Sequence, residues 1–158
     1  MALGHMETME HVEILQNWPR PSSVGEAGIN ACQRPFLISY LTQDDKLAVI
    51  EVHLCHQLVY GHPNDESLHG HPLFQSGLEY YSVHRVSNSK LIAQLEARNA
   101  SHPRHNREEF LSGKEHYIIT FQDATLEFVA TSNAYFPLKV HVFENVAQAE
   151  TALGRGVA

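Results

Sequence analysis

Regular alternation of apolar and polar positions makes the stretch from Leu47 to Tyr60 the clearest predicted strand of the chain. Its apolar positions recur at every second residue, for example at Ile50 and Leu54. A period of two is typical of a strand with one buried and one polar face, as in antiparallel sheets. His56 falls within the apolar stripe, so we expect a core histidine with satisfied hydrogen bonds. A strand this long is expected to bend or to carry a bulge.

Shorter β patterns lie on both sides of this strand. Runs rich in β-branched and aromatic residues, bounded by turn residues, predict strands at 36–41, 78–86, 116–121, 125–131 and 138–143. Residues 122–124 are short and polar, which predicts a hairpin between two of these strands. Together with the long strand this gives about six strands.

One helix is well supported by the pattern. Leu91, Ile92 and Leu95 form a narrow apolar stripe between Asn88 and Arg98, with Ser87 as the expected N-cap. Shorter helices are expected after Asn106 and from 145 to 153. The order of strands, helix and strands predicts an α+β fold with a mainly antiparallel sheet, and a half-closed barrel is left open.

The domain organisation follows from composition along the chain. Residues 1–33 carry polar, Pro- and Gly-containing stretches and are predicted to form a partly flexible arm. Residues 34–150 are predicted to form a single α+β domain, and the Gly-rich end at 151–158 a frayed tail. A length of 158 residues is sufficient for one hydrophobic core without cross-links.

Composition and charge indicate which kinds of partner and which cellular location to expect. A net charge of −7 and scattered basic residues argue against a nucleic-acid partner. No apolar run reaches the roughly 20 residues needed to span a bilayer, and the N-terminus lacks a signal-peptide pattern, so a cytoplasmic location is expected. The two cysteines lack CxxC spacing, which favours reduced thiols.

The loop from Gly61 to Pro72 concentrates the candidate chemistry, with three of the twelve histidines of the chain. His69 and His71 flank a glycine and could bind one divalent transition metal, given further ligands from elsewhere. The alternative is that both are solvated loop histidines. Cofactor use is therefore left open.

Acid–base chemistry without a metal is the second hypothesis for this loop. Histidine exchanges protons near neutral pH, and a nearby carboxylate fixes its tautomer. Candidate residues for catalysis are His71, His116, Glu127, Asp65 and Glu66. The last two have an alternative as helix-capping residues after Asn64, and Glu127 has an alternative on an exposed strand face.

A second polar loop carries candidate ligand-binding residues. His102, Arg104 and His105 surround a proline, and the arginine could contact an anionic group of a ligand. The alternative is a surface cap with no ligand. We expect this loop to border a pocket with the loop 61–72 and the hairpin that carries Glu127.

Three segments together resemble a group of small, uncharacterised bacterial proteins. These are Asn64–Pro72 with an NDExLxGHP-like pattern, His102–Asn106 with an HPxHN-like pattern, and His116–Ala130 with an HxIxTFxDxTxE-like pattern. Gln122 stands where such proteins often have histidine. The resemblance implies that the three segments belong to one unit, and it implies no activity, cofactor or partner.

Two functional hypotheses follow from these observations. The first is a small cytosolic enzyme, a hydrolase, lyase or isomerase, acting on a small polar molecule through a histidine–carboxylate pocket. The second is a non-catalytic ligand-binding or protein-interaction module, with a homodimer paired through an edge strand such as 138–143 as one form.

Overall fold

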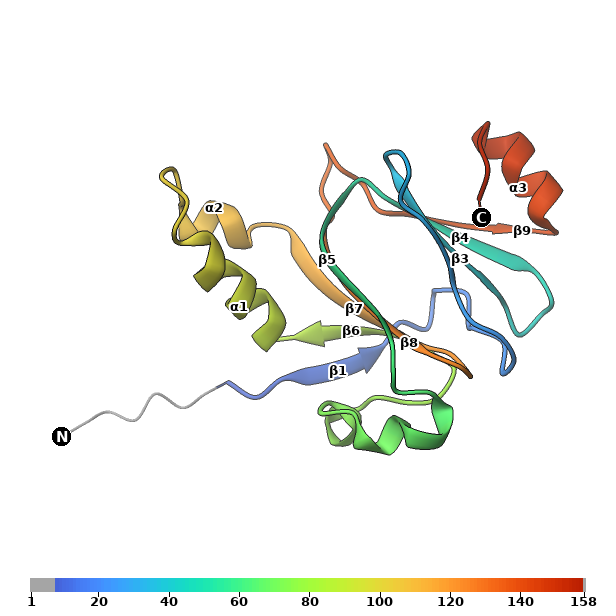
Figure 1. The fold of residues 1–158 in the computed structure, drawn as a ribbon, viewed down its shortest axis with the longest axis horizontal. Coiled ribbons are helices and arrows are strands. Elements are labelled where there is room, and N and C mark those ends of the chain that lie inside the picture. Colours follow the sequence, from blue (N-terminus) through green and yellow to red (C-terminus); the bar gives the residue numbers. More distant parts are fainter. Residues whose placement is uncertain (1–7, 158) are drawn as a thin grey trace.

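Two antiparallel sheets form the framework of the protein (Figure 1). The computed structural model describes residues 8–157. One sheet has five strands in the order β1-β6-β7-β8-β5, and the other has four in the order β2-β3-β4-β9. The predicted α+β class with antiparallel pairing is confirmed. The strands are β1 (His11–Ile14), β2 (Gly28–Asn30), β3 (Phe36–Leu41), β4 (Leu47–Val52), β5 (Leu54–Gly61), β6 (Val83–Ser87), β7 (Lys114–Thr120), β8 (Thr125–Thr131) and β9 (Lys139–Phe143).

The long predicted strand passes from one sheet to the other. It bends at His53, so that β4 lies in the four-stranded sheet and β5 in the five-stranded sheet. The register against β8 shifts between Cys55 and Gln57, which confirms the predicted bulge. The bulge turns His56 outward, and its Nε2 lies 2.7 Å from the Thr131 hydroxyl. The core position predicted for His56 is therefore wrong, because a bulge breaks the period of two.

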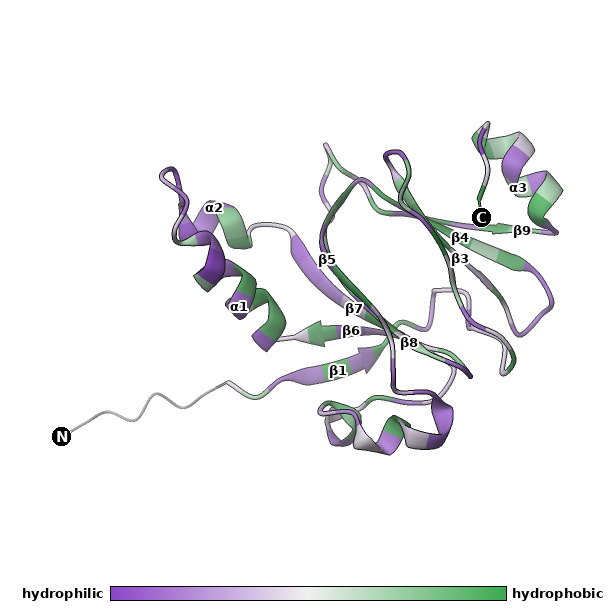
Figure 2. Ribbon diagram, viewed as in Figure 1, coloured by the Kyte–Doolittle hydropathy of each residue, from purple (hydrophilic) through white to green (hydrophobic). Residues whose placement is uncertain are grey.

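The main hydrophobic core lies between the two sheets. Residues of β4 such as Ile50 meet residues of β7 and β8 such as Ile119 and Phe128, all with at most 1% of their surface exposed. The ring of Tyr117 stacks on Phe128 with centroids 5.1 Å apart. Figure 2 shows hydrophobic residues along the strands of both sheets. This core makes β7 and β8 a rigid platform for side chains on their opposite face.

The ends of the described chain pack onto the sheets. Strand β1 pairs with β6 and buries Val12, and β2 pairs with β3, so the segment expected as an arm contributes one strand to each sheet. Residues 1–7 of that segment lie outside the described residues. Val157, in the segment expected to fray, is 1% exposed and packs in a small cluster with Leu37 and Val49.

The helices lie at the two ends of the molecule (Figure 1). Their bounds are α1 (Lys90–Asn99), α2 (Arg107–Leu111) and α3 (Val146–Leu153), with short 3-10 turns η1 (Asp65–Gly70) and η2 (Phe74–Ser76). Helix α1 begins two residues later than predicted, because Ser89 rather than Ser87 caps it. Strand β6 is shorter than predicted because Tyr81 adopts a positive φ of 47°. Within residues 8–157 no helix is long and apolar enough to cross a membrane.

Candidate functional site

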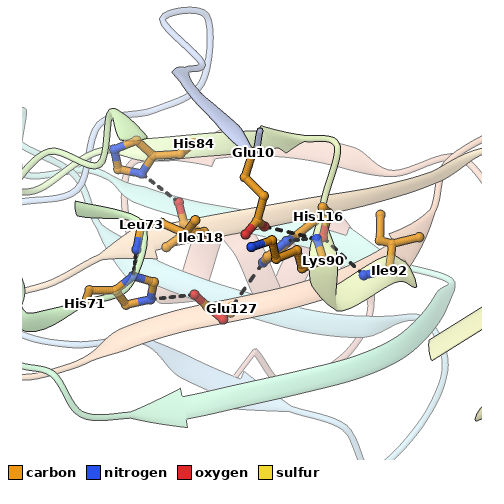
Figure 3. Close-up of polar contacts among 10 residues, drawn as sticks. Glu10, His71, Leu73, His84, Lys90, Ile92, His116, Ile118 and Glu127 are labelled. Atoms are coloured by element: carbon orange, nitrogen blue, oxygen red, sulfur yellow. Dashed lines mark hydrogen bonds and ion pairs between the residues drawn. The ribbon is translucent and has the colours of Figure 1, made fainter. Parts of the chain in front are cut away.

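The β7–β8 hairpin places His116 and Glu127 on one face of the five-stranded sheet. His116 pairs with Val129, and Glu127 pairs with Ile118. His116 and Glu127 are therefore diagonal neighbours, two positions apart in register, which brings long side chains within reach of each other. Their face points away from the main core and toward the turns η1 and η2. His71, which follows η1, completes the group (Figure 3).

His71 is held by both ring nitrogens. The backbone N–H of Leu73 donates to its Nδ1 at 3.0 Å, and its Nε2 lies 2.6 Å from Oε1 of Glu127. Because Nδ1 accepts a hydrogen bond, the proton of the neutral ring sits on Nε2 and is donated to the carboxylate. Burial raises the pKa of Glu127, but the His71 hydrogen bond and the two nearby histidines together lower it by more, so the net pKa falls below the ordinary value.

His116 has one satisfied nitrogen and one unsatisfied nitrogen. Its Nδ1 lies 2.7 Å from the Ser89 hydroxyl, at the start of α1. Its Nε2 points to Oε2 of Glu127 at 3.9 Å and has no hydrogen-bond partner among the described residues. The side chain is only 2% exposed, and burial lowers its pKa despite the nearby Glu127 carboxylate. His116 is thus a buried, neutral imidazole with an unused polar atom.

The surroundings of Ser89 decide which nitrogen of His116 carries the proton. The Ser89 oxygen accepts a hydrogen bond from the Ile92 N–H at 3.1 Å, as an N-cap does. Its own hydrogen then has Nδ1 of His116 as its acceptor, which leaves the imidazole proton on Nε2. The opposite tautomer would aim a nitrogen lone pair at the Glu127 carboxylate, which is repulsive. Both histidines therefore present an Nε2–H to one carboxylate.

A pocket of about 610 Å³ opens above these three side chains. In Figure 3 the Glu127 carboxylate lies between the rings of His71 and His116. The other lining side chains come from the N-terminal segment, the loop before η1, η1 itself, the turn after it, and α1; they include Glu10, His62, Leu73, Lys90, Leu91 and Gln94. A concave site with apolar walls and a few convergent polar groups is the usual form of a small-molecule site.

The two other carboxylates predicted in the loop have no place at this pocket. The Tyr81 hydroxyl donates to Oδ2 of Asp65 at 2.5 Å, which fixes the turn before β6. Glu66 is exposed to solvent. Asn64 caps η1 by accepting a hydrogen bond from the Ser67 N–H at 3.2 Å. Neither Asp65 nor Glu66 lines the pocket, and the residue that caps η1 is Asn64.

The predicted metal pair does not converge. His69 is exposed, whereas His71 faces Glu127 and uses both nitrogens. Across residues 8–157, no group of three or more histidine, cysteine, aspartate or glutamate side chains is arranged to hold a metal ion.

The loop with His102, Arg104 and His105 borders a different depression, of about 260 Å³. Nδ1 of His105 accepts from the Asn99 amide at 2.8 Å, and Nε2 lies 2.9 Å from the Glu96 carboxylate. His102 accepts a hydrogen bond from the Arg104 backbone N–H at 3.1 Å. Hydrogen bonds of its own histidines therefore hold this loop in place. The expectation that it borders the Glu127 pocket is wrong, because its hydrogen bonds hold it against α1.

Three parts of the site are absent from the sequence-based predictions. Ser89 fixes the tautomer of His116, the Leu73 amide fixes that of His71, and the Lys90 N–H donates to the Glu10 carboxylate at 3.1 Å. The only available signal was Ser87-Asn88-Ser89 before a helix, in which either serine fits an N-cap.

Comparison of the chain with protein-family models, with curated proteins and with solved structures finds no match. Function resides in the geometry and chemistry of a site rather than in the fold that carries it. Here that site is the pocket around Glu127.

Proposed function

We propose that the protein is a small cytoplasmic enzyme that moves a proton to and from a small polar substrate bound in the pocket above Glu127. The observation that carries this proposal is the unpartnered Nε2–H of His116, buried beside a carboxylate at the pocket floor. Hydrolases, lyases and isomerases all use such a step.

An unsatisfied buried polar atom lowers the stability of the folded protein, and no described residue of the site supplies a hydrogen-bond partner for Nε2 of His116. Leaving such a donor unpaired costs about 1–3 kcal/mol. A flip of the His116 ring would break the hydrogen bond between Nδ1 and the Ser89 hydroxyl without giving both ring nitrogens a partner. Groups of this kind are concentrated at functional sites, where a ligand supplies the missing partner.

The proposed proton transfer uses two atoms of the site, Oε2 of Glu127 and Nε2–H of His116. Oε2 of Glu127 receives no hydrogen bond from any described residue, so it is available to accept a proton from a substrate C–H, O–H or bound water. His71 holds the other oxygen in place. The Nε2–H of His116 then stabilises negative charge that develops on a substrate oxygen, as a preorganised donor does. The proton returns from Glu127 to the product.

A non-catalytic ligand-binding module is the second candidate, and one observation favours it. The pKa of Glu127 lies below its ordinary value, because the effect of burial, which raises it, is outweighed by the His71 hydrogen bond and the two nearby histidines together. A carboxylate with a lowered pKa is a weaker base. Turnover distinguishes the two candidates, because a module binds its ligand and returns it unchanged.

The substitution His116→Asn tests the proposal most selectively. The asparagine amide occupies the place of Nδ1 and keeps a partner for Ser89, but it removes Nε2. We expect turnover of a substrate found by screening small amides, esters, hydroxy acids and ketoses to fall by about 10²-fold, the usual effect of losing one such donor. The thermal unfolding midpoint should fall only slightly, because the Ser89 hydrogen bond is kept while the smaller side chain leaves a void.

The matched control is His105→Asn, which alters a histidine of the separate loop and should leave turnover unchanged. The proposal is contradicted if His116→Asn turns over every substrate as the parent does. It is also contradicted if the variant shows weakened folding as its sole defect, since His116 would then be a structural residue.

A further inference from the structure

We infer that the ligand of this pocket presents a carbonyl oxygen and an N–H or O–H hydrogen on neighbouring atoms, and that a primary carboxamide is the simplest group of this class. This inference rests on the proposed function and names the kind of substrate that the site takes. Its basis is the unsatisfied Nε2–H of His116 and the neighbouring carboxylate oxygen Oε2 of Glu127 at the pocket floor.

The pocket floor offers one donor and one acceptor side by side. The donor is Nε2–H of His116, whose proton position follows from Ser89, and the acceptor is Oε2 of Glu127. They lie 3.9 Å apart, too far for a hydrogen bond between them but close enough for one planar ligand group to reach both. A carboxamide fits, because its oxygen accepts from His116 while its NH₂ group donates to Glu127.

Charge at the floor excludes the two obvious ionic groups. A ligand carboxylate has acceptors only, so its second oxygen would face the ionised Oε2 of Glu127. The Lys90 ammonium also lines the pocket, but it is the single Lys or Arg of the lining against two carboxylates, Glu10 and Glu127. The N-terminus of α1 does not compensate, because the Lys90 backbone N–H already donates to the Glu10 carboxylate at 3.1 Å. An ammonium group has donors only and would leave the Nε2–H of His116 unsatisfied. A neutral group with both functions satisfies the two atoms together.

The pocket walls indicate what surrounds this polar group. Pro63, Pro72, Leu73 and Leu91 line the pocket with apolar surface. A volume of about 610 Å³ has room for a ring attached to the polar group. Benzamide is therefore a suitable test compound, and benzoate is its isosteric anion.

Binding requires a small movement of Glu127. Nε2 of His116 is closed to solvent in the free pocket, whereas the Glu127 side chain is 21% exposed. Because Oε2 of Glu127 lies 3.9 Å from Nε2, we expect rotation of this carboxylate to open a path to Nε2. The hydrogen bond from His71 then keeps Glu127 beside the ligand.

The test is titration of the full chain with benzamide and with benzoate at neutral pH, followed by side-chain ¹⁵N resonances of His116. We expect benzamide to shift the Nε2 resonance and to bind at least tenfold more tightly than benzoate. In Glu127→Gln the preference should disappear, because the glutamine amide can donate to a carboxylate. In Glu96→Gln, which alters a histidine-paired glutamate elsewhere, the preference should persist.

Equal affinity for the two compounds, tighter binding of benzoate or no binding of either overturns the inferred ligand class. Persistence of the preference in Glu127→Gln overturns it as well. These outcomes are separable from failure of the proposed function. If His116→Asn loses turnover but the parent does not bind benzamide, the protein is an enzyme and the inferred ligand class is wrong. If the parent binds benzamide but His116→Asn keeps its turnover, the catalytic role of His116 is wrong.

Discussion

Replacing Glu127 by glutamine is expected to lower turnover by about 10²- to 10⁴-fold, the range for loss of a general base. Glutamine has almost the same shape, and its carbonyl oxygen can still accept the hydrogen bond that His71 donates at 2.6 Å. The variant should therefore stay folded, with a free energy of unfolding within about 1 kcal/mol of the parent. Steady-state kinetics and denaturant unfolding measure the two effects separately.

Glu96→Gln is the matched control for this substitution. Glu96 also lies close to a histidine, with 2.9 Å between its Oε1 and Nε2 of His105, but it lines a different pocket, beside α1 and α2. Its turnover should equal that of the parent. If Glu127→Gln and Glu96→Gln retain the same activity, the histidine–carboxylate pair at the pocket is structural and the account of catalysis fails.

Acidification from about pH 7 to about pH 5 is expected to reduce the free energy of unfolding, by up to about 1.4 kcal/mol per pH unit for each neutral buried histidine. His84 and His116 are at most 2% exposed. Burial lowers the pKa of both, although the carbonyl of Ile118 partly offsets this for His84, and Glu127 does so for His116. The unfolded chain, with histidine pKa values near 6.5, therefore binds more protons than the folded chain. Stability is complete above that pH and declines as the pH falls below it.

His84→Asn tests the source of this slope. The Nδ1 of His84 donates to the Ile118 carbonyl at 3.0 Å, and an asparagine amide can make the same bond without a titratable group. Urea unfolding across the pH range should give a shallower slope for His84→Asn. His69→Asn, at an exposed position, should keep the parent slope. Identical slopes for these two variants would show that buried histidines do not determine the acid sensitivity.

Much of the sheet framework was predictable because strand patterns are local. Strands β3 and β8 have the predicted bounds, and the hairpin at 122–124 joins β7 and β8 as expected. The face shared by His116 and Glu127 follows once that hairpin register is known. Strands β1 and β2 are short, four and three residues, and carry too little pattern for sequence reasoning to separate them from a loop.

The site itself was only partly predictable, because tertiary contacts decide which polar residues meet. His71, His116 and Glu127 come together, whereas His102 and Arg104 lie at another depression. Sequence spacing cannot show that α1 brings Ser89 to Nδ1 of His116, since that contact spans 27 residues. It also cannot separate a capping histidine from a site histidine, because both arise from the same loop composition.

The central claim is that Glu127 lies between two histidines that each accept a hydrogen bond at Nδ1 and carry their proton on Nε2. Side-chain ¹⁵N spectra of the free protein at neutral pH measure this directly. The account predicts that His71 and His116 both show a protonated Nε2 and an unprotonated, hydrogen-bonded Nδ1. A proton on Nδ1 of either ring, or an imidazolium at either position, would contradict it.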